Sequence, residues 1–483
     1  MLTREAIAEQ LEAILGPERV ITDKEVLKES SIDRYRKVQS VFGIYELPIP
    51  AAVVKPADAA QVAAILRFAD KNNLNCVPRT GGSATEGGLE TIVENSIVID
   101  GTAMNRIVKI DPVSMMATAQ CGVNLEVLEN RLREQGLTMG HSPQSKPLAM
   151  MGGLVATRSI GQFSTLYGGI EDMVIGLEAV FPNGEITRIK NVPRRACGPD
   201  IRHIIIGNEG ALCYITEVTV KLYRFYPENN RFLAYALPDM KTGLDILRNV
   251  ITTGYRPSIA RLYDAEDGAQ HGFNQFAGDN CVLIFMAEGP ERIVTATIEG
   301  ITEIAGTCKG WTAIDPRAIE NWFNTLNWGP EKVAQEREFL KKNLNTGFTT
   351  EVSGNWDCIL AIYENALARI KKDFPHVDDL TMLGGHSSHS YQTGTNMYFV
   401  YDYNIKGDPA EELEKYHVPL NAIIVEETLK AGGSMVHHHG IGKYRTPWTK
   451  EEHGSAYYLL DSLKKVLDPN GIMNKGTIYP VEE

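Results

Sequence analysis

The chain has no long hydrophobic run. No apolar stretch is long enough to cross a bilayer. The opening residues, MLTREAIAEQLEAILG, carry charges throughout, whereas a signal peptide has an uninterrupted apolar stretch. These absences favour a cytoplasmic protein, and they leave peripheral contact with a membrane surface open.

Cysteine is scarce, and no two cysteines form a Cys-x-x-Cys pair. Only seven occur among 483 residues. Iron–sulfur clusters and zinc ribbons use paired cysteines, so the sequence disfavours both. The odd, scattered set is typical of reduced thiols. We expect Cys358, in GNWDCIL, to be a small core residue without chemistry.

Positive charge is also in short supply. Lys and Arg number 48 against 61 Asp and Glu, which gives a net charge of −13. Nucleic-acid binding depends on clustered Lys and Arg, so no nucleic-acid partner is expected. Hydrophobic residues make up 43% and charged residues 23%, as in ordinary soluble enzymes. The length exceeds what one core usually serves, which indicates at least two domains.

The character of the sequence changes near residue 225. Residues 1–100 alternate helix and strand patterns, and residues 100–224 are richer in strands, with a Pro-Asn-Gly turn at 182–184. After residue 225, helical stretches such as DMKTGLDILRNVITTG alternate with strands such as CVLIFMAEG. The pattern predicts an α+β fold with a second α+β domain. The last forty residues return to the character of the start.

Glycine is abundant, and three glycine-rich segments follow one another before residue 225. The first, PRTGGSATEGG at 78–88, could surround a phosphate with backbone N–H groups. It is neither GxGxxG nor a Walker loop, and alone it could equally be a surface loop. The second, at 141–186, contains Gly152-Gly153 and Gly168-Gly169. The third, GNEGALCYITEVTVKL, begins at Gly207.

Three such segments in this order resemble the FAD-binding domain of the vanillyl-alcohol oxidase / p-cresol methylhydroxylase (PCMH) superfamily. The closing LDPNGIMNKGTIYP resembles the superfamily's C-terminal tail. The resemblance implies a PCMH-type FAD-binding domain at 1–224, completed by a tail at 440–483. It also implies a cap or substrate domain at 225–439, with the site between the two.

The resemblance implies one extended FAD. The first loop contains no histidine that could attach it, so we expect non-covalent FAD. The residues implied in cofactor binding are Pro78, Arg79, Thr80, Gly81, Gly82, Ser83, Ala84, Gly152, Gly153, Thr157, Ser159, Ser164, Glu209, Gly210 and Ile215.

Three consecutive histidines lie in MVHHHGIGK, residues 435–443. The D-2-hydroxyacid dehydrogenases of this superfamily bind a metal through two histidines and a glutamate, and the corresponding places here hold His386, Tyr398 and His438. Tyrosine is a poor replacement ligand. In an extended segment His437 and His439 would share one side while His438 faces away. We therefore expect no metal site.

The same region resembles a second branch, the alkyldihydroxyacetonephosphate synthases, through HHHGIGKYRTPW, GHSPQS and the tyrosine in NMYF. This resemblance implies a transferase of ether-lipid synthesis. Such an enzyme exchanges an acyl group for a fatty alcohol through a flavin N5 adduct, without net electron transfer. The residues implied in catalysis are Tyr398 for proton transfer, His437, His438, His439 and His141.

Arginine and histidine residues near these motifs are candidates for substrate binding. Arg261, in PSIARLYD, could bind an anionic group, or it could form a surface ion pair. Lys443 and Arg445 could each bind phosphate or merely hold the tail. His386 is implied as a further substrate-side group, with His389 behind it.

An alternative function is an FAD-linked dehydrogenase or oxidase of a 2-hydroxy acid or alcohol. In that case Tyr398 would be the base, and an electron-acceptor protein would be a partner. A flavoprotein scaffold without activity is a third hypothesis. For either enzyme we expect a small-molecule or lipid substrate and a homodimer.

Overall fold

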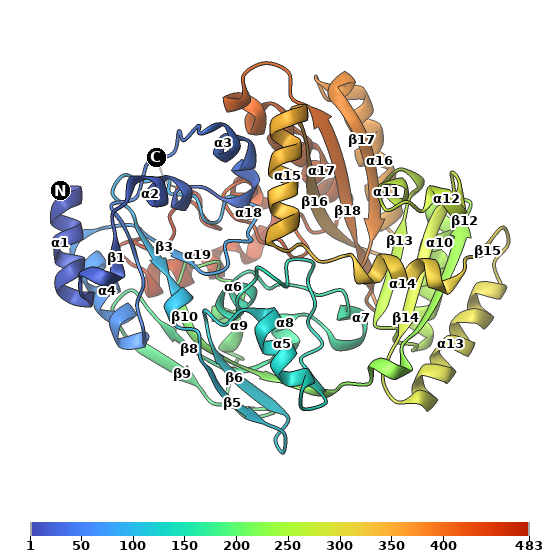
Figure 1. Ribbon diagram of the computed structural model, residues 1–483, viewed down its shortest axis with the longest axis horizontal. Helices are drawn as coiled ribbons and strands as arrows, with labels where there is room; N and C mark the ends of the chain where they lie inside the picture. Colours follow the sequence, from blue (N-terminus) through green and yellow to red (C-terminus); the bar gives the residue numbers. More distant parts are fainter. Residues whose placement is uncertain (1, 482–483) are drawn as a thin grey trace.

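The computed structural model describes residues 2–481 and combines helices with four sheets. The predicted α+β class is confirmed. Figure 1 shows the N-terminal sheets on one side and a large sheet with its helices on the other. Among the described residues, no helix has both the length and the apolar character needed to cross a membrane.

A four-stranded sheet begins the fold. Its strand order is β1 (Val20–Ile21), β2 (Ala52–Val54), β4 (Ile97–Asp100) and β3 (Cys76–Arg79). Helix α1 (Arg4–Leu15) and the crossover helix α4 (Ala59–Asn72) pack on it. As the spacing predicts, Val62, Ile65, Leu66 and Ala69 form the buried face of α4. The glycine-rich loop at 78–88 therefore follows directly from a parallel strand.

The second sheet is antiparallel. Its order is β5 (Ile107–Asp111), β6 (Met116–Gln120), β10 (Tyr214–Lys221), β8 (Val174–Val180) and β9 (Ile186–Ile189). The predicted turn at 182–184 joins β8 to β9, and Gly184 has a φ of +78° that favours glycine. A small sheet pairs β11 (Tyr223–Arg224) with β7 (Leu137–Thr138).

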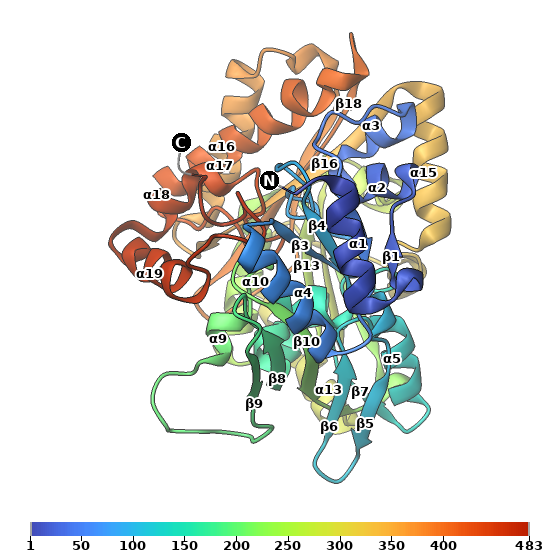
Figure 2. The same cartoon turned by 90° about the vertical axis from the view of Figure 1, so that its left-hand side faces the viewer.

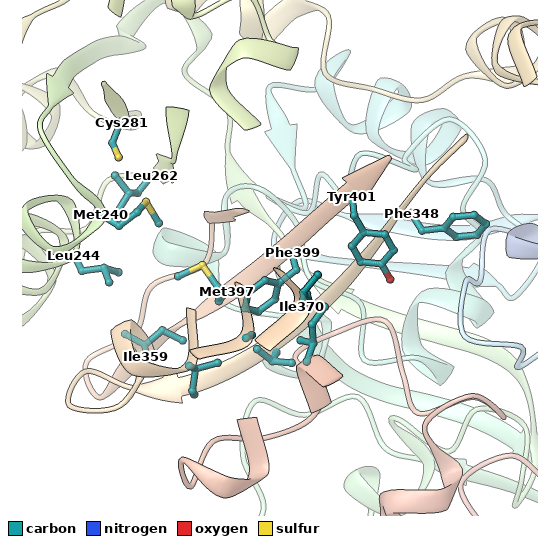
Figure 3. Close-up of a cluster of buried hydrophobic side chains, with 14 of the residues drawn as sticks. Met240, Leu244, Leu262, Cys281, Phe348, Ile359, Ile370, Met397, Phe399 and Tyr401 are labelled. Atoms are coloured by element: carbon teal, nitrogen blue, oxygen red, sulfur yellow. The ribbon is translucent and has the colours of Figure 1, made fainter. Parts of the chain in front are cut away.

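The seven-stranded sheet carries much of the site. Its order is β15 (Thr312–Ala313), β12 (Arg231–Leu237), β14 (Cys281–Ala287), β13 (Ile259–Tyr263), β17 (Leu380–Ser387), β18 (Gly394–Asn404) and β16 (Asn345–Asn355). One face packs against α10 (Met240–Thr253), α13 (Glu291–Gly306), α16 (Ile359–Asp373) and α17 (Val418–Lys430). Figure 3 shows this core, with Met397, Phe399 and Tyr401 of β18 pointing into it.

Alternation along these strands places the polar residues on the opposite face. Since Met397, Phe399 and Tyr401 face the helices, Tyr398 faces away from them. His386 and Glu351 are its direct cross-strand partners, and Arg261 alternates with the core residues Ala260 and Leu262. The seven-stranded sheet thus presents four polar side chains to one side.

The remaining helices are short or lie at the edges of these layers. They are α2 (Lys24–Ser30), α3 (Lys37–Phe42), α5 (Leu125–Arg133), α6 (Met151–Ala156), α7 (Ser164–Tyr167), α8 (Ile170–Met173), α9 (Arg202–Ile205), α11 (Ala265–Gln270), α12 (Asn274–Ala277), α14 (Pro316–Asn324), α15 (Pro330–Asn343), α18 (Thr449–His453) and α19 (Tyr457–Leu467). Cys358 lies partly exposed just before α16, at the edge of the core rather than inside it.

Both ends of the chain connect the N-terminal sheets to the part that contains the seven-stranded sheet. The tail returns to β3, where the Cys76 N–H donates to the Ile472 carbonyl at 2.7 Å, and Figure 2 shows α18 and α19 to the left of α4. Tyr35 and Val38 pack into the core of the large sheet. We propose that the domain boundary lies between residues 224 and 225. The N-terminal segment around Tyr35 and Val38 then packs against the cap domain.

A buried histidine in the cap core should make stability fall in acid. His417 is fully buried, its Nδ1 lies 2.8 Å from the Tyr401 hydroxyl, and its ring stacks on Phe348. Burial lowers its pKa to about 3. Its folded pKa lies below its unfolded pKa of about 6.5, so this stability is present above pH 6.5 and is lost as pH falls.

We expect His417 to account for about 2 kcal/mol of the unfolding free energy lost between pH 7 and pH 5. Urea unfolding at both pH values would measure this loss. In His417→Gln the loss should shrink by about that amount, and exposed His453→Gln should behave as the wild type. An unchanged pH dependence in His417→Gln would contradict the assignment.

Candidate active site

A cavity of 620 Å³ lies between the glycine-rich segments and the polar face of the large sheet. The predicted cofactor residues that line it are Pro78, Arg79, Thr80, Gly81, Gly82, Ser83, Ala84, Gly152, Gly153, Thr157, Ser159, Glu209, Gly210 and Ile215. From the cap side it is lined by Arg261, His386, His389 and Tyr398, and His438 and His439 close it. Segments far apart in sequence therefore meet around one space.

The loop at 78–88 fits a phosphate-bearing cofactor. Gly82 has a φ of +66°, and a Cβ at Gly81 would lie 2.4 Å from the Leu148 carbonyl oxygen. The loop therefore packs closely on the neighbouring segment and presents little side chain to the cavity. Backbone N–H groups together with the hydroxyls of Thr80 and Ser83 suit phosphate oxygens, as the FAD pyrophosphate requires.

Glu209 lines the cavity and also holds the segment that follows the three histidines. Its carboxylate accepts hydrogen bonds from the N–H groups of Ile441 and Gly442 at 2.7 and 2.8 Å. Burial raises the pKa of Glu209 to about 7. This residue thus joins the cofactor side of the cavity to the histidine segment.

Tyr398 is the centre of the polar cluster. Its hydroxyl lies 3.2 Å from His438 Nε2 and 2.6 Å from His439 Nε2. The ring of His386 stacks on it with centroids 4.7 Å apart. Burial raises the pKa of Tyr398 well above its ordinary value. The phenol is therefore protonated at rest and has imidazole nitrogens on two sides.

Arg261 places an unpaired cation at the cavity. It is 4% exposed, and its Nη2 lies 3.2 Å from His386 Nε2. Its Nε and Nη1 have no hydrogen-bonding partner among the described residues. The guanidinium also lies over the rings of Tyr263 and Trp322. Such a group favours an anion.

Asp267 fixes the imidazole of His386, which lies between Arg261 and Tyr398. His386 Nδ1 lies 2.5 Å from a carboxylate oxygen of Asp267. Burial lowers the pKa of His386, so the neutral ring donates from Nδ1 to Asp267 and accepts from Arg261 at Nε2.

The three histidines do not form an extended segment. The fully buried Glu351 carboxylate accepts hydrogen bonds from the N–H groups of His437, His438 and His439 at 2.5, 3.3 and 2.7 Å. The chain therefore turns around this carboxylate. The prediction that His438 faces away from His437 is wrong, because their Nδ1 atoms lie 2.8 Å apart.

The turn also creates a grouping of imidazoles. One ring nitrogen from each of His389, His437 and His438 lies within 4.8 Å of the other two. Neutral imidazoles are ordinary transition-metal ligands. These three histidines are not the residues at the metal-ligand positions of the dehydrogenases, which here are His386, Tyr398 and His438. The absence of a metal stays a prediction.

Arg445 does not bind substrate from the position that the structure gives it. It is fully buried and does not line the cavity. Its Nη2 lies 2.9 Å from Glu86 Oε1, and its Nη1 donates to the carbonyl oxygens of Glu351 and Met435. Arg445, expected as a substrate ligand, instead forms an internal ion pair with Glu86 beneath the histidine segment.

Three further predicted site residues do not line the cavity. His141 is buried behind Ser159, with its Nε2 3.2 Å from the Ser159 hydroxyl, and burial lowers its pKa to about 3. Ser164 is bonded to His389 Nδ1 at 2.8 Å. His437 contacts Tyr391 rather than the cavity. Lys443 holds the tail through Asn474 and Thr477.

The sequence alone does not single out Glu351, Asp267 or Tyr391. Glu351 is a lone carboxylate in the strand GFTTEVSG, and an inward-facing charge in such a strand could have indicated a buried role. Asp267 lies in the short helix after β13, and Tyr391 lies in the turn before β18. Nothing local distinguishes these two from ordinary surface residues.

Comparisons with known proteins agree with this geometry. A family described as "FAD binding domain" matches residues 50–190, and one described as "FAD linked oxidases, C-terminal domain" matches residues 226–478. The chain is 68% identical over 483 residues to "Uncharacterized FAD-linked oxidoreductase YgcU" of Escherichia coli O157:H7, covering 100% of both chains.

The chain is more distantly similar to alkyldihydroxyacetonephosphate synthases. The chain is 27% identical over 464 residues to alkyldihydroxyacetonephosphate synthase of Caenorhabditis elegans, covering 90% of this chain and 76% of the relative. A solved alkyldihydroxyacetonephosphate synthase has a TM-score of 0.77 at 22% identity, covering 100% of this chain and 85% of that one. The resemblance to the superfamily is confirmed, and at this identity the solved structure supports the fold alone.

The family matches and the cavity support the same cofactor. The first two glycine-rich segments that line the cavity, at 78–88 and 141–186, lie within the match to the FAD binding domain, and the polar cluster lies within the match to the C-terminal domain. The chain is therefore an FAD-dependent enzyme, and it belongs to the family of FAD-linked oxidases that join an FAD binding domain to this C-terminal domain.

Proposed function

We propose that this protein is an FAD-linked oxidoreductase that oxidises a small hydroxy compound carrying a carboxylate or phosphate, with 2-hydroxy acids as the first choice. The unpaired Arg261 guanidinium in the cavity carries this proposal. When bound, FAD supplies the two-electron acceptor for such an oxidation. The 68% identical relative is also an FAD-linked oxidoreductase by name.

The spacing of the cluster suits a short substrate. The unpartnered Nε and Nη1 of Arg261 could each donate a hydrogen bond to an anionic group. His386 contacts Arg261 at 3.2 Å and stacks on Tyr398, so one imidazole separates the anion site from the phenol. In a 2-hydroxy acid the hydroxyl is one carbon from the carboxylate. Such a molecule could place its hydroxyl at Tyr398 while Arg261 holds its charge.

Proton transfer would then fall to Tyr398. Its raised pKa means that it holds its proton at rest, and burial lowers the pKa of His438 well below its ordinary value. The neutral His438 has a lone pair to offer at Nε2, 3.2 Å from the phenol. Tyr398 can therefore accept the substrate's proton as it gives its own to His438.

Anaerobic flavin reduction tests the proposal. FAD-loaded protein would be mixed with D- and L-2-hydroxy acids, glycerol phosphates and neutral alcohols, and the flavin absorbance followed. We expect bleaching by an anionic hydroxy compound. Acid precipitation of the same protein should release the flavin if it is non-covalent. A flavin that no hydroxy compound bleaches would contradict the proposal.

Arg261→Met should weaken substrate binding and leave FAD in place. Loss of charge-assisted hydrogen bonds of about 1.5–3 kcal/mol corresponds to a rise of roughly 10- to 150-fold in the half-saturating concentration of an anionic substrate. The half-saturating concentration of a neutral alcohol should not change. Arg248→Met, on the exposed face of α10, is the matched control. An equal effect on charged and neutral substrates would argue against an anion site.

Acyl exchange is the second candidate. The placement of Tyr398 between two imidazoles and the 27% identical synthase support it. However, the side chains near Tyr398 include Arg261, Asp267, His271 and His386, which suit a charged group better than an alkyl chain. Anaerobic incubation with palmitoyl-dihydroxyacetone phosphate and hexadecanol, followed by mass spectrometry, would separate the two. Alkyl ether formed without an electron acceptor would favour exchange.

A further inference from the structure

We propose that Tyr398, His438, His437 and Tyr391 form a proton relay that leads from the cavity to the outside of the protein, with Tyr391 as its exit. The inference rests on the proposed oxidation, which releases one hydroxyl proton for each substrate molecule. Tyr398 and His438 line the cavity, whereas His437 and Tyr391 do not. We call this set the proton relay.

Every link of the proton relay is within hydrogen-bonding distance. The Tyr398 hydroxyl lies 3.2 Å from His438 Nε2. His438 Nδ1 lies 2.8 Å from His437 Nδ1, and His437 Nε2 lies 2.7 Å from the Tyr391 hydroxyl. Each imidazole therefore uses both ring nitrogens, one on each side. This is the arrangement that a ring needs in order to take a proton at one nitrogen and release another.

The hydrogen bonds can all point outward at once. Tyr398 donates to His438 Nε2, His438 Nδ1–H donates to His437 Nδ1, and His437 Nε2–H donates to Tyr391. When the substrate hydroxyl gives its proton to Tyr398, each member passes one proton onward and Tyr391 releases one. The O–H bond of the substrate breaks and one proton leaves the protein. The electron pair and the carbon-bound hydrogen are accounted for by the flavin's two-electron reduction.

Burial explains why the proton would pass on rather than stay. Burial raises the pKa values of Tyr398 and Tyr391, and it lowers that of His437 to about 4 and that of His438 further below its ordinary value. Neither a phenolate nor an imidazolium is therefore favoured within the chain. A proton that enters at Tyr398 has no stable resting place before the exit.

Tyr391 lies where the relay meets charge and solvent. It is half-buried in the turn between β17 and β18, with its N–H donating to the Gly394 carbonyl at 2.8 Å. Glu171 and Asp172, in α8, lie close enough to raise its pKa. Asp172 is exposed and Glu171 is half-buried. These carboxylates and the surrounding water can accept the proton that Tyr391 releases.

The surrounding contacts hold the two imidazoles in place. The carboxylate of Glu351 accepts the N–H groups of His437 and His438 and so fixes the backbone of both residues. The ring of His389 stacks on His437 with centroids 5.2 Å apart, and Ser164 in turn holds His389. A metal ion bound by His389, His437 and His438 would replace the Nδ1–Nδ1 link, so the relay and a metal exclude each other.

Tyr391→Phe tests the exit in the FAD-loaded protein. With the 2-hydroxy acid that bleaches the flavin, we expect the reduction rate to fall roughly tenfold, less than the ~10²–10⁴-fold of a direct acid–base group. The dependence of the rate on the D₂O fraction should be curved in the wild type, because several protons move together. It should become linear in Tyr391→Phe, while the half-saturating concentration stays unchanged.

Tyr401→Phe is the matched control. It also removes a hydroxyl bonded to a histidine, His417, but on the core face of β18. Its D₂O dependence should match the wild type. If Tyr391→Phe keeps the wild-type rate and curvature, or slows without a change in curvature, the relay is wrong and Tyr391 serves only to hold His437.

A second measurement does not depend on turnover. The ¹⁵N spectrum of histidine-labelled, FAD-loaded protein, assigned with His437→Gln and His438→Gln, should show His438 protonated at Nδ1 and His437 at Nε2. Two Nε2–H tautomers, or a stoichiometric transition metal on these residues, would overturn the relay. If no hydroxy compound bleaches the wild-type flavin, the proposed function fails, while these spectra still decide the relay.

Discussion

Tyr398→Phe is expected to retain FAD and to lower the rate of flavin reduction by ~10²–10⁴-fold. The substitution removes the hydroxyl that lies between His438 and His439, and the ring that stacks on His386 remains. The cavity should keep its shape because only one oxygen is lost. Rapid-mixing absorbance at saturating substrate would measure the rate, and the flavin content of the purified variant would measure cofactor retention.

Tyr363→Phe provides a control for the loss of a buried phenol. Its hydroxyl donates to Asp264 at 2.7 Å and is not part of the cavity. We expect this variant to reduce its flavin at a rate close to that of the wild type. Wild-type turnover in Tyr398→Phe would remove Tyr398 from proton transfer and leave the two imidazoles as the candidates.

Arg445→Met is expected to lower the free energy of unfolding by about 3–5 kcal/mol. The guanidinium is fully buried between Glu86 and Glu351, at 2.9 and 3.6 Å. Its removal would leave two buried carboxylates without their cation. It would also unpair the Glu351 and Met435 carbonyl oxygens that Arg445 Nη1 binds. Denaturant unfolding with and without FAD would measure the change.

The matched control is Arg131→Met. Arg131 also pairs with a glutamate, Glu134, at 2.6 Å, but both side chains are mostly exposed. Exposed pairs contribute little, so its unfolding midpoint should not move. If Arg445→Met were as stable as this control while substrate affinity fell, the original expectation of a substrate ligand would return.

Local patterns predicted the helices and turns well. The apolar spacing of Val62, Ile65, Leu66 and Ala69 appears as the buried face of α4. The turn at 182–184 joins two strands as expected. Such features depend on residues close in sequence, where backbone preference and hydrophobic periodicity act directly. The glycine-rich loops could be recognised for the same reason.

The roles of single charged residues could not be predicted. Arg261 and Arg445 look alike in sequence, yet one has unpartnered N–H groups at the cavity and the other lies between two carboxylates. An extended segment would place His437 and His438 on opposite sides, but the carboxylate of Glu351, 86 residues before His437, turns the backbone. The partners that decide these roles come from distant strands.

The sequence by itself predicted the α+β class, which follows from local periodicity. The FAD cofactor and the loops that surround it were implied by the resemblance of three glycine-rich segments to the PCMH superfamily. Only the tertiary structure decided which histidines meet, which arginine faces the cavity and that Glu351 holds the histidine turn. The physical reason is that burial and charge pairing depend on the register of β13, β16, β17 and β18. A shift of one residue in any of these strands would move its polar side chains to the helix-covered face.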